Sequence, residues 1–214
     1  MKKILIVILM LCPVTIYAQQ TKTLSGFHQW DILGEVHAGA SISTITKANA
    51  DPLIKPTGGV AINMMVMDNV TVDFEMNFHW LGGENRTVEQ TLNDGNVDRA
   101  SAKVWLTYLD TEYHIRGYIA KGLSIYTGMQ MGTLLYAKAH ADDGRHANFK
   151  DDCRSGRFAV PVGITKDFGR FFIDARGYYQ VNKTPKNARA RAFMSDGGQV
   201  HNAQVTIGYR FQIL

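Results

Sequence analysis

Apolar and polar residues alternate strictly between Val70 and Trp80. In the stretch VTVDFEMNFHW the even-numbered positions are apolar and the odd-numbered positions are polar. A period of two predicts a β-strand, whose successive side chains point to opposite faces. In a soluble sheet the apolar face packs inward, whereas in a transmembrane barrel it faces lipid. The direction in which Phe74 points therefore separates two classes of protein.

The same alternation recurs along the chain and indicates an all-β fold with eight strands. The other seven segments are residues 35–43, 59–67, 109–116, 123–138, 158–165, 171–181 and 204–213. The pattern is longer and more often repeated than chance would give.

The predicted connections alternate between short and long. Residues 67–69, 117–121 and 167–170 form short turns, and Asn69 is suited to a left-handed conformation. Residues 45–57, 81–101, 139–155 and 183–199 form long polar loops. Short turns on one side and long loops on the other are typical of outer-membrane barrels. We therefore predict an all-β, eight-stranded, antiparallel up-and-down transmembrane β-barrel with three short periplasmic turns and four long external loops.

The polar face of the predicted strands is rich in charge. Its predicted charge network comprises Glu35, His37, Asp73, Glu75, Asp110, Glu112, His114, Arg116, Asp174, Arg176 and Arg210. The same face also carries His79 and Lys138. Charges inside a narrow barrel must pair, and eight strands leave an interior that side chains can fill. We expect a closed lumen, with a narrow pore for small solutes as the alternative. A soluble lipocalin-like binder is disfavoured, because a ligand cavity is mostly apolar.

The opposite face is apolar and aromatic, which suits lipid with interfacial girdles. The predicted lipid-facing residues are Phe74, Met76, Phe78, Trp80, Tyr113, Tyr179, Tyr209 and Phe211. This face offers almost no serine, histidine or carboxylate, so we do not expect an enzyme. The three inward histidines lie at different heights along their strands, so neither a shared metal site nor a cofactor is predicted.

The first residues have the three-part layout of a secretory signal peptide. Two lysines precede an apolar run from Ile4 to Ile16, and Ile16-Tyr17-Ala18 precedes Gln19. The run is short for a membrane span and contains Pro13. We expect cleavage after Ala18, a periplasmic segment over residues 19–31 and a barrel over residues 32–214. Cleavage removes Lys2 and Lys3, which lowers the net charge from +4 to +2 and gives no reason to expect nucleic-acid binding.

The predicted loop 183–199 is basic. It contains Lys183, Lys186, Arg189 and Arg191, and such a loop at the outer rim could contact lipopolysaccharide phosphates or another acidic ligand. A solvated loop balanced by neighbouring acids is the alternative. Cys153, in KDDCRSG, is the one cysteine left after cleavage, and we expect a solvated loop thiol there.

The export signal, the eight strands and the stretches VDFEMNFHW and VTIGYRF together resemble the small outer-membrane β-barrels ("porin family") of Gram-negative bacteria. The chain is similar in plan to the OmpX/OmpA barrels from about Ile32 to Leu214. The resemblance implies a location in the outer membrane and contact with outer-membrane lipid. It also implies insertion by the barrel-insertion machinery, for which Phe211 is the candidate recognition signal. It implies no catalytic residue and no particular extracellular ligand. A secretion-system accessory remains a further alternative.

Overall fold

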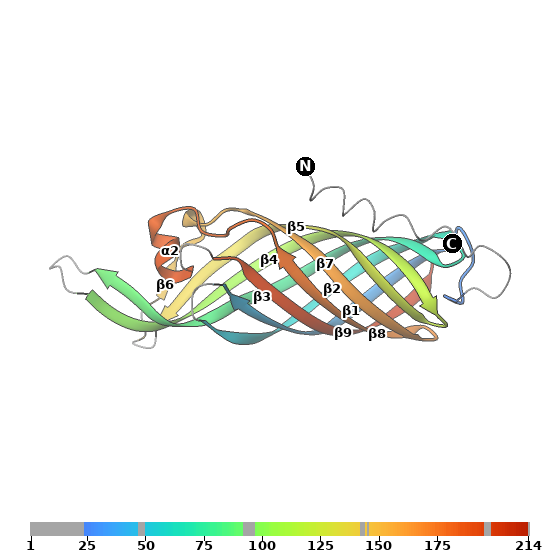
Figure 1. The fold of residues 1–214 in the computed structure, drawn as a ribbon, viewed down its shortest axis with the longest axis horizontal. Coiled ribbons are helices and arrows are strands. Elements are labelled where there is room, and N and C mark those ends of the chain that lie inside the picture. The colour runs from blue at the N-terminus through green and yellow to red at the C-terminus, as the bar shows by residue number, and fades with distance from the viewer. Residues whose placement is uncertain are drawn as a thin grey trace, which may run out of the picture.

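In the part of the chain that the structure describes, there are nine strands and two short helices. The strands form an elongated barrel (Figure 1). The computed structural model describes residues 24–46, 50–91, 97–141, 144, 146–194 and 198–213. The strands are β1 (Ile32–Ile45), β2 (Ala50–Met67), β3 (Val70–Thr91), β4 (Val97–Ala120), β5 (Leu123–Ala141), β6 (His146–Asn148), β7 (Gly156–Phe168), β8 (Phe171–Gln180) and β9 (Val200–Gln212). The helices are η2 (Lys150–Asp152) and α2 (Ala188–Met194).

The sheet closes on itself. Every neighbouring pair is antiparallel, β1 pairs with both β2 and β9, and β4 also pairs with β5. The three-residue β6 pairs with β5 alone, so eight of the nine strands form the wall. The prediction of a closed eight-stranded antiparallel barrel is confirmed.

Three turns of two residues each join strands at one end, here called the turn end. They are Asp68-Asn69, Lys121-Gly122 and Gly169-Arg170. Two predicted turns were longer because the strands continue through bulges, with Val66 and Ile119 as the extra residues. The third was longer because Asp167 and Phe168 still pair with β8. The expectation for Asn69 was wrong, since Trp30 is the one non-glycine with positive φ in the described chain.

The opposite end, here called the loop end, carries β6, η2 and α2 (Figure 1). Two of the long loops predicted there are largely strand. In the predicted loop 45–57, Leu53 pairs with Ser43 of β1. In the predicted loop 81–101, Val88 of β3 pairs with Ala100 of β4. Beyond Asn85 and Ala102, β3 and β4 pair only with each other. The alternation weakens in this second range because a hairpin that projects past the wall needs no apolar face. Residues 142–155 and 181–199 lie outside the barrel strands, as far as they are described, and hold β6 and the two helices.

Side chains alternate between the outside and the inside of the barrel as the pattern requires. Phe74 is 38% exposed on the outer surface, while its neighbours Asp73 and Glu75 are buried inside. Large apolar side chains are exposed on all eight strands of the wall, for example Ile62, Ile115, Val162 and Ile207. Among the described residues, no helix is long and apolar enough to cross a membrane.

Residues 24–31 run across the turn end. The Leu24 amide donates to Asn69 Oδ1 at 3.0 Å, and the Gly122 amide donates to the Leu24 carbonyl at 2.7 Å. Ser25 Oγ reaches the Asp68 carbonyl at 3.4 Å. This segment therefore ties together two of the three turns.

Candidate functional site: a charged lumen under an apolar cap

Two ion-pair groups lie in the half of the lumen nearest the turn end. Arg116 Nε donates to Asp73 Oδ2 at 2.7 Å, and its Nη1 donates to Thr165 Oγ1 at 2.6 Å. Arg210 bridges Glu35 at 2.8 Å and Asp167 at 2.5 Å. Glu35 and Arg210 are direct partners on β1 and β9, so this pair also spans the seam of the barrel.

Arg176 occupies the middle of the lumen. Its Nε donates to Asp174 Oδ1 at 2.6 Å, and its Nη1 donates to Glu75 Oε1 at 2.7 Å. Tyr178 donates its hydroxyl to Glu112 at 3.0 Å, and Tyr126 donates to Asp174 at 2.8 Å. Hydroxyl donors satisfy carboxylate oxygens that the guanidinium leaves free, which a buried charge requires.

Two glycines make room for these groups. A Cβ on Gly163 would lie 2.2 Å from the Tyr126 ring, and one on Gly132 would lie 1.8 Å from Asp110 Oδ1. Neither overlap is possible between real atoms, so a side chain at either site would displace a member of the network.

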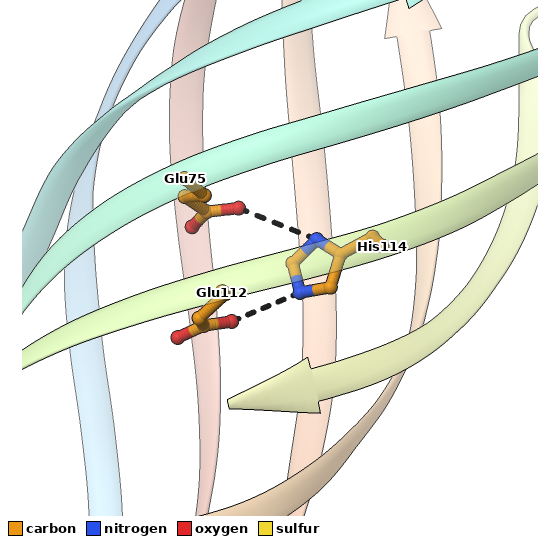
Figure 2. Close-up of side chains that lie close together, drawn as sticks. All are labelled: Glu75, Glu112 and His114. Atoms are coloured by element: carbon orange, nitrogen blue, oxygen red, sulfur yellow. Dashed lines mark hydrogen bonds and ion pairs between the residues drawn. The ribbon is translucent and has the colours of Figure 1, made fainter. Parts of the chain in front are cut away.

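The buried histidines each contact carboxylates. His114 lies between Glu112 Oε2, 3.0 Å from its Nε2, and Glu75 Oε2, 3.6 Å from its Nδ1 (Figure 2). His37 Nε2 lies 3.2 Å from Glu75 Oε1 and 2.8 Å from Asn77 Oδ1. A second group lies closer to the loop end. In it, His79 hydrogen-bonds Asp110, and Gln130 donates to Asp110 and Glu112.

Glu75, Glu112 and His114 also have the donor types that suit a zinc ion. One ligand atom from each lies within 4.8 Å of the others. However, Arg176 Nη1 already lies 2.7 Å from Glu75 Oε1 and 3.4 Å from Glu112 Oε2. A guanidinium in this place supplies the positive charge that a metal would bring, so the arrangement is that of an ion-pair network.

Sequence reasoning missed one arginine of the lumen and misplaced one lysine. Arg157 is buried, donating to Asn202 Oδ1 at 2.6 Å and lying 3.4 Å from Asp110. Lys138 was predicted to face inward, yet it is exposed. Leu135 is an extra residue on β5, because Tyr108 pairs with Leu134 and Thr107 with Tyr136. This bulge reverses the faces of β5 beyond it.

The described lumen therefore holds six buried carboxylates, four arginines and three histidines. The carboxylates are Glu35, Asp73, Glu75, Asp110, Glu112 and Asp174; the arginines are Arg116, Arg157, Arg176 and Arg210; the histidines are His37, His79 and His114. All eleven residues of the predicted charge network lie inside the barrel and are buried.

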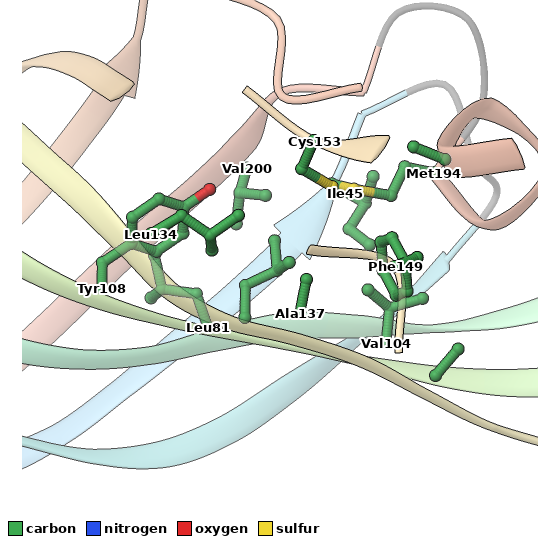
Figure 3. Close-up of a cluster of buried hydrophobic side chains, with 13 residues drawn as sticks. Ile45, Leu81, Val104, Tyr108, Leu134, Ala137, Phe149, Cys153, Met194 and Val200 are labelled. Atoms are coloured by element: carbon green, nitrogen blue, oxygen red, sulfur yellow. The ribbon is translucent and has the colours of Figure 1, made fainter. Parts of the chain in front are cut away.

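An apolar cluster, here called the cap, fills the lumen toward the loop end (Figure 3). Its members from the wall and from the loops are Ile45, Leu81, Val104, Leu106, Tyr108, Leu134, Ala137, Ala139, Phe149, Cys153, Ala190, Met194 and Val200. Phe149 stacks on Phe193 of α2 with ring centroids 5.0 Å apart. Backbone bonds join the two loops, from Arg154 to Thr184 at 2.8 Å and from Lys186 to Asp152 at 2.9 Å.

Cys153 belongs to the cap. The expectation of a solvated thiol was wrong, because the residue is 6% exposed and packs in the apolar cluster. This burial, with a smaller effect of Asp152, raises the pKa of the Cys153 thiol to about 12. The thiol is therefore neutral near pH 7 and is a poor nucleophile.

The predicted basic loop lies over the cap. Lys183, Lys186, Arg189 and Arg191 are all exposed around α2. Arg189 Nη1 lies 3.6 Å from Asp152 Oδ2 on the neighbouring loop. That loop adds two exposed bases that the sequence reasoning did not single out, Lys150 and Arg154.

The predicted lipid-facing residues lie on the outer surface. Phe74, Met76, Phe78, Trp80, Tyr113, Tyr179 and Phe211 are exposed, and Tyr209 is partly exposed. Phe74 and Tyr113 meet edge to face with centroids 5.2 Å apart, as do Phe171 and Tyr209.

A closed eight-stranded antiparallel barrel, with an apolar outside and a polar inside, has the architecture of an outer-membrane β-barrel. Among solved structures it is similar to Ail of Yersinia pestis in complex with the heparin analogue sucrose octasulfate (18% identity, 85% of this chain and 99% of that chain, TM-score 0.47). It is also similar to Neisserial surface protein A (10%, 85% and 97%, TM-score 0.45) and to OprG of Pseudomonas aeruginosa (12%, 86% and 97%, TM-score 0.44). The sequence matches no protein-family model and no curated protein.

Proposed function

We propose that this chain is an exported outer-membrane barrel with a closed lumen, which anchors external loops that bind a ligand at the cell surface. In this proposal residues 1–18 are a signal peptide, residues 19–31 lie in the periplasm and the apolar outer face contacts outer-membrane lipid. The barrel-insertion machinery is the expected partner during assembly. No catalytic role is proposed.

The observation that carries the closed lumen is the pairing of its arginines. Arg176 reaches Glu75 on the opposite wall at 2.7 Å, Arg116 reaches Thr165 on β7 at 2.6 Å, and Arg210 reaches Asp167 on β7 at 2.5 Å. Their side chains therefore extend into the lumen instead of lining a water-filled path. The cap adds a second, apolar barrier above them. Both features favour a filled barrel over the alternative of a narrow pore.

The loop end offers a surface on which positive charge is in excess. Lys150, Arg154, Lys183, Lys186, Arg189 and Arg191 are exposed there. The acids described on the same two loops are Asp151 and Asp152. Arginine and lysine together favour phosphate oxygens, and a patch of one sign raises the local concentration of an anion. We therefore propose the phosphate groups of lipopolysaccharide as the ligand.

The test is binding of lipopolysaccharide to the mature barrel reconstituted in lipid nanodiscs. We expect saturable binding that weakens as salt rises, because screening shortens the reach of surface charges. The variant K183Q/K186Q/R189Q/R191Q should bind at least about tenfold more weakly, a loss that four exposed charges can supply.

A matched control removes positive charge from the other end. Lys121, Lys166 and Arg170 lie at or beside the turns and are exposed. The variant K121Q/K166Q/R170Q should bind as the unchanged protein does. Equal losses in both variants would show that net charge, and not the loop surface, governs binding, and would overturn the assignment of the ligand site.

A further inference from the structure

A pair of histidines is exposed at the loop end, outside the lumen. His140 on β5 and His146 on β6 are direct partners across the antiparallel hairpin. Both are exposed, and their Nδ1 atoms lie 3.0 Å apart. Their rings meet edge to face with centroids 3.7 Å apart. The hairpin therefore places two ring nitrogens side by side in solvent.

This spacing is that of two ligands on one metal ion. Zinc–nitrogen bonds are about 2.0–2.1 Å long, so two nitrogens on one ion lie about 2.9 Å apart at a right angle and about 3.3 Å apart at a tetrahedral angle. The observed 3.0 Å falls between these values. A hydrogen bond between the two rings uses one lone pair, whereas a metal ion engages a lone pair from each.

The neighbouring residues hold His140 in place. Trp105 on β4 stacks on the His140 ring with centroids 5.5 Å apart, and Lys55 Nζ lies 4.3 Å from the Trp105 ring centre. Lys103, the β4 partner of His140, is paired with Glu84 at 3.7 Å, which offsets part of its charge. A ring fixed by stacking loses little freedom on binding, which favours affinity.

The geometry points to a surface site for a late first-row divalent cation, such as Zn²⁺, Ni²⁺ or Cu²⁺, held by His140 and His146. Imidazole is a preferred ligand of these three ions. Two protein ligands leave coordination positions to water or to a group from a second molecule. The site differs from the proposed phosphate surface in its residues and in the charge of its ligand.

The first experiment is calorimetric titration of the folded, mature barrel, made without a polyhistidine tag, with ZnCl₂. We expect saturable binding of one ion. His140→Ala and His146→Ala should each weaken it by at least about tenfold, because each removes one of the two ligands. His28→Ala is the matched control, since that side chain is 87% exposed at the turn end. It should leave binding unchanged.

Trp105 provides a second and independent readout. Ni²⁺ or Cu²⁺ bound beside the stacked ring should quench tryptophan fluorescence, and Trp105→Phe should remove that part of the quenching although Trp30 and Trp80 remain. Circular dichroism confirms that each variant is folded. Absence of saturable binding, or equal binding by the His140→Ala/His146→Ala double variant, would overturn the proposal.

Discussion

Arg176 on β8 reaches across the lumen to Glu75 on β3, with Nη1 2.7 Å from Oε1, although three other strands separate β8 from β3 in the wall. Such a contact joins opposite walls, which the hydrogen-bond ladder cannot do. The first prediction concerns this pair. Arg176→Met should lower the free energy of unfolding by about 3–5 kcal/mol, because it leaves a buried carboxylate without its partner.

Urea unfolding of the barrel in detergent micelles measures this loss. Glu75→Gln together with Arg176→Met should be more stable than Arg176→Met alone, since one of the two carboxylates that lose Arg176 is then neutral. Arg170→Ala is the control, because Arg170 is exposed and its change should lower the free energy of unfolding much less. A loss no larger for Arg176→Met than for Arg170→Ala would contradict the role given to the pair.

The second prediction concerns conduction. The mature protein inserted into a planar lipid bilayer should give no stable, uniform current steps, because paired arginines and the apolar cap fill the lumen. Uniform steps that shift in Arg176→Ala would instead favour the narrow pore. Failure of the refolded protein to insert at all would contradict a lipid-facing Phe74.

The third prediction tests the cap. Leu106→Ala should destabilise the barrel by about 2–5 kcal/mol, the usual cost of a cavity at a fully buried leucine. Ile54→Ala provides the comparison, because Ile54 is 70% exposed and its truncation should lower the free energy of unfolding much less. Both are measured by the same urea unfolding, and equal losses would argue against a packed cap.

The fourth prediction follows from the burial of Cys153. Its pKa of about 12 keeps the thiol protonated at pH 8, so iodoacetamide should label it at least about a hundredfold more slowly in the folded than in the unfolded protein. Because burial raises the pKa only in the folded state, this thiol leaves the free energy of unfolding unchanged below the unfolded pKa and lowers it as pH rises from there toward about 12. Mass spectrometry measures the labelling.

The control moves the thiol two positions along the loop. Ser155 is exposed, so the variant Cys153→Ala/Ser155→Cys should be labelled about as fast folded as unfolded. Rapid labelling of native Cys153 would show that the loops do not close over the lumen.

The fifth prediction compares two turn glycines. Gly122 and Gly169 both have positive φ, at 63° and 70°, so alanine is strained at each by about 1 kcal/mol. At Gly122 a Cβ would also lie 2.9 Å from the Asp167 carbonyl, whereas nothing lies within 4 Å at Gly169. Gly122→Ala should therefore be the more destabilising in urea unfolding, and equal effects would show that the turn relaxes freely.

The period-two pattern was sufficient to predict the wall of the barrel. It predicted the eight strands and the outward direction of Phe74. A strand with one face on lipid and the other on a polar lumen must alternate between apolar and polar residues. It failed at bulges, where one extra residue exchanges the faces. Lys138 was misplaced for that reason, since the pairing that reveals Leu135 as a bulge depends on residues far along the chain.

The cap could not be predicted from alternation. Leu81, Leu106 and Leu134 are apolar residues inside a barrel whose interior is otherwise polar, so they resemble the outer face. What decides their burial is the packing of Phe149 and α2 from the loops above. Arg157 was missed because it lies at the start of β7, where too few residues precede it to define a period.

The ladder between β1 and β9 also sets the order in which the fold can be completed. Leu33, near the start of the wall, pairs with Gln212, near the end of the chain. During synthesis and export one edge of β1 stays unpaired until β9 is available to pair with it. Open edges are where sheets aggregate, and contacts between such distant residues form slowly. Loss of the final strand would therefore leave a sheet with two free edges that can pair with other chains, and not a smaller barrel.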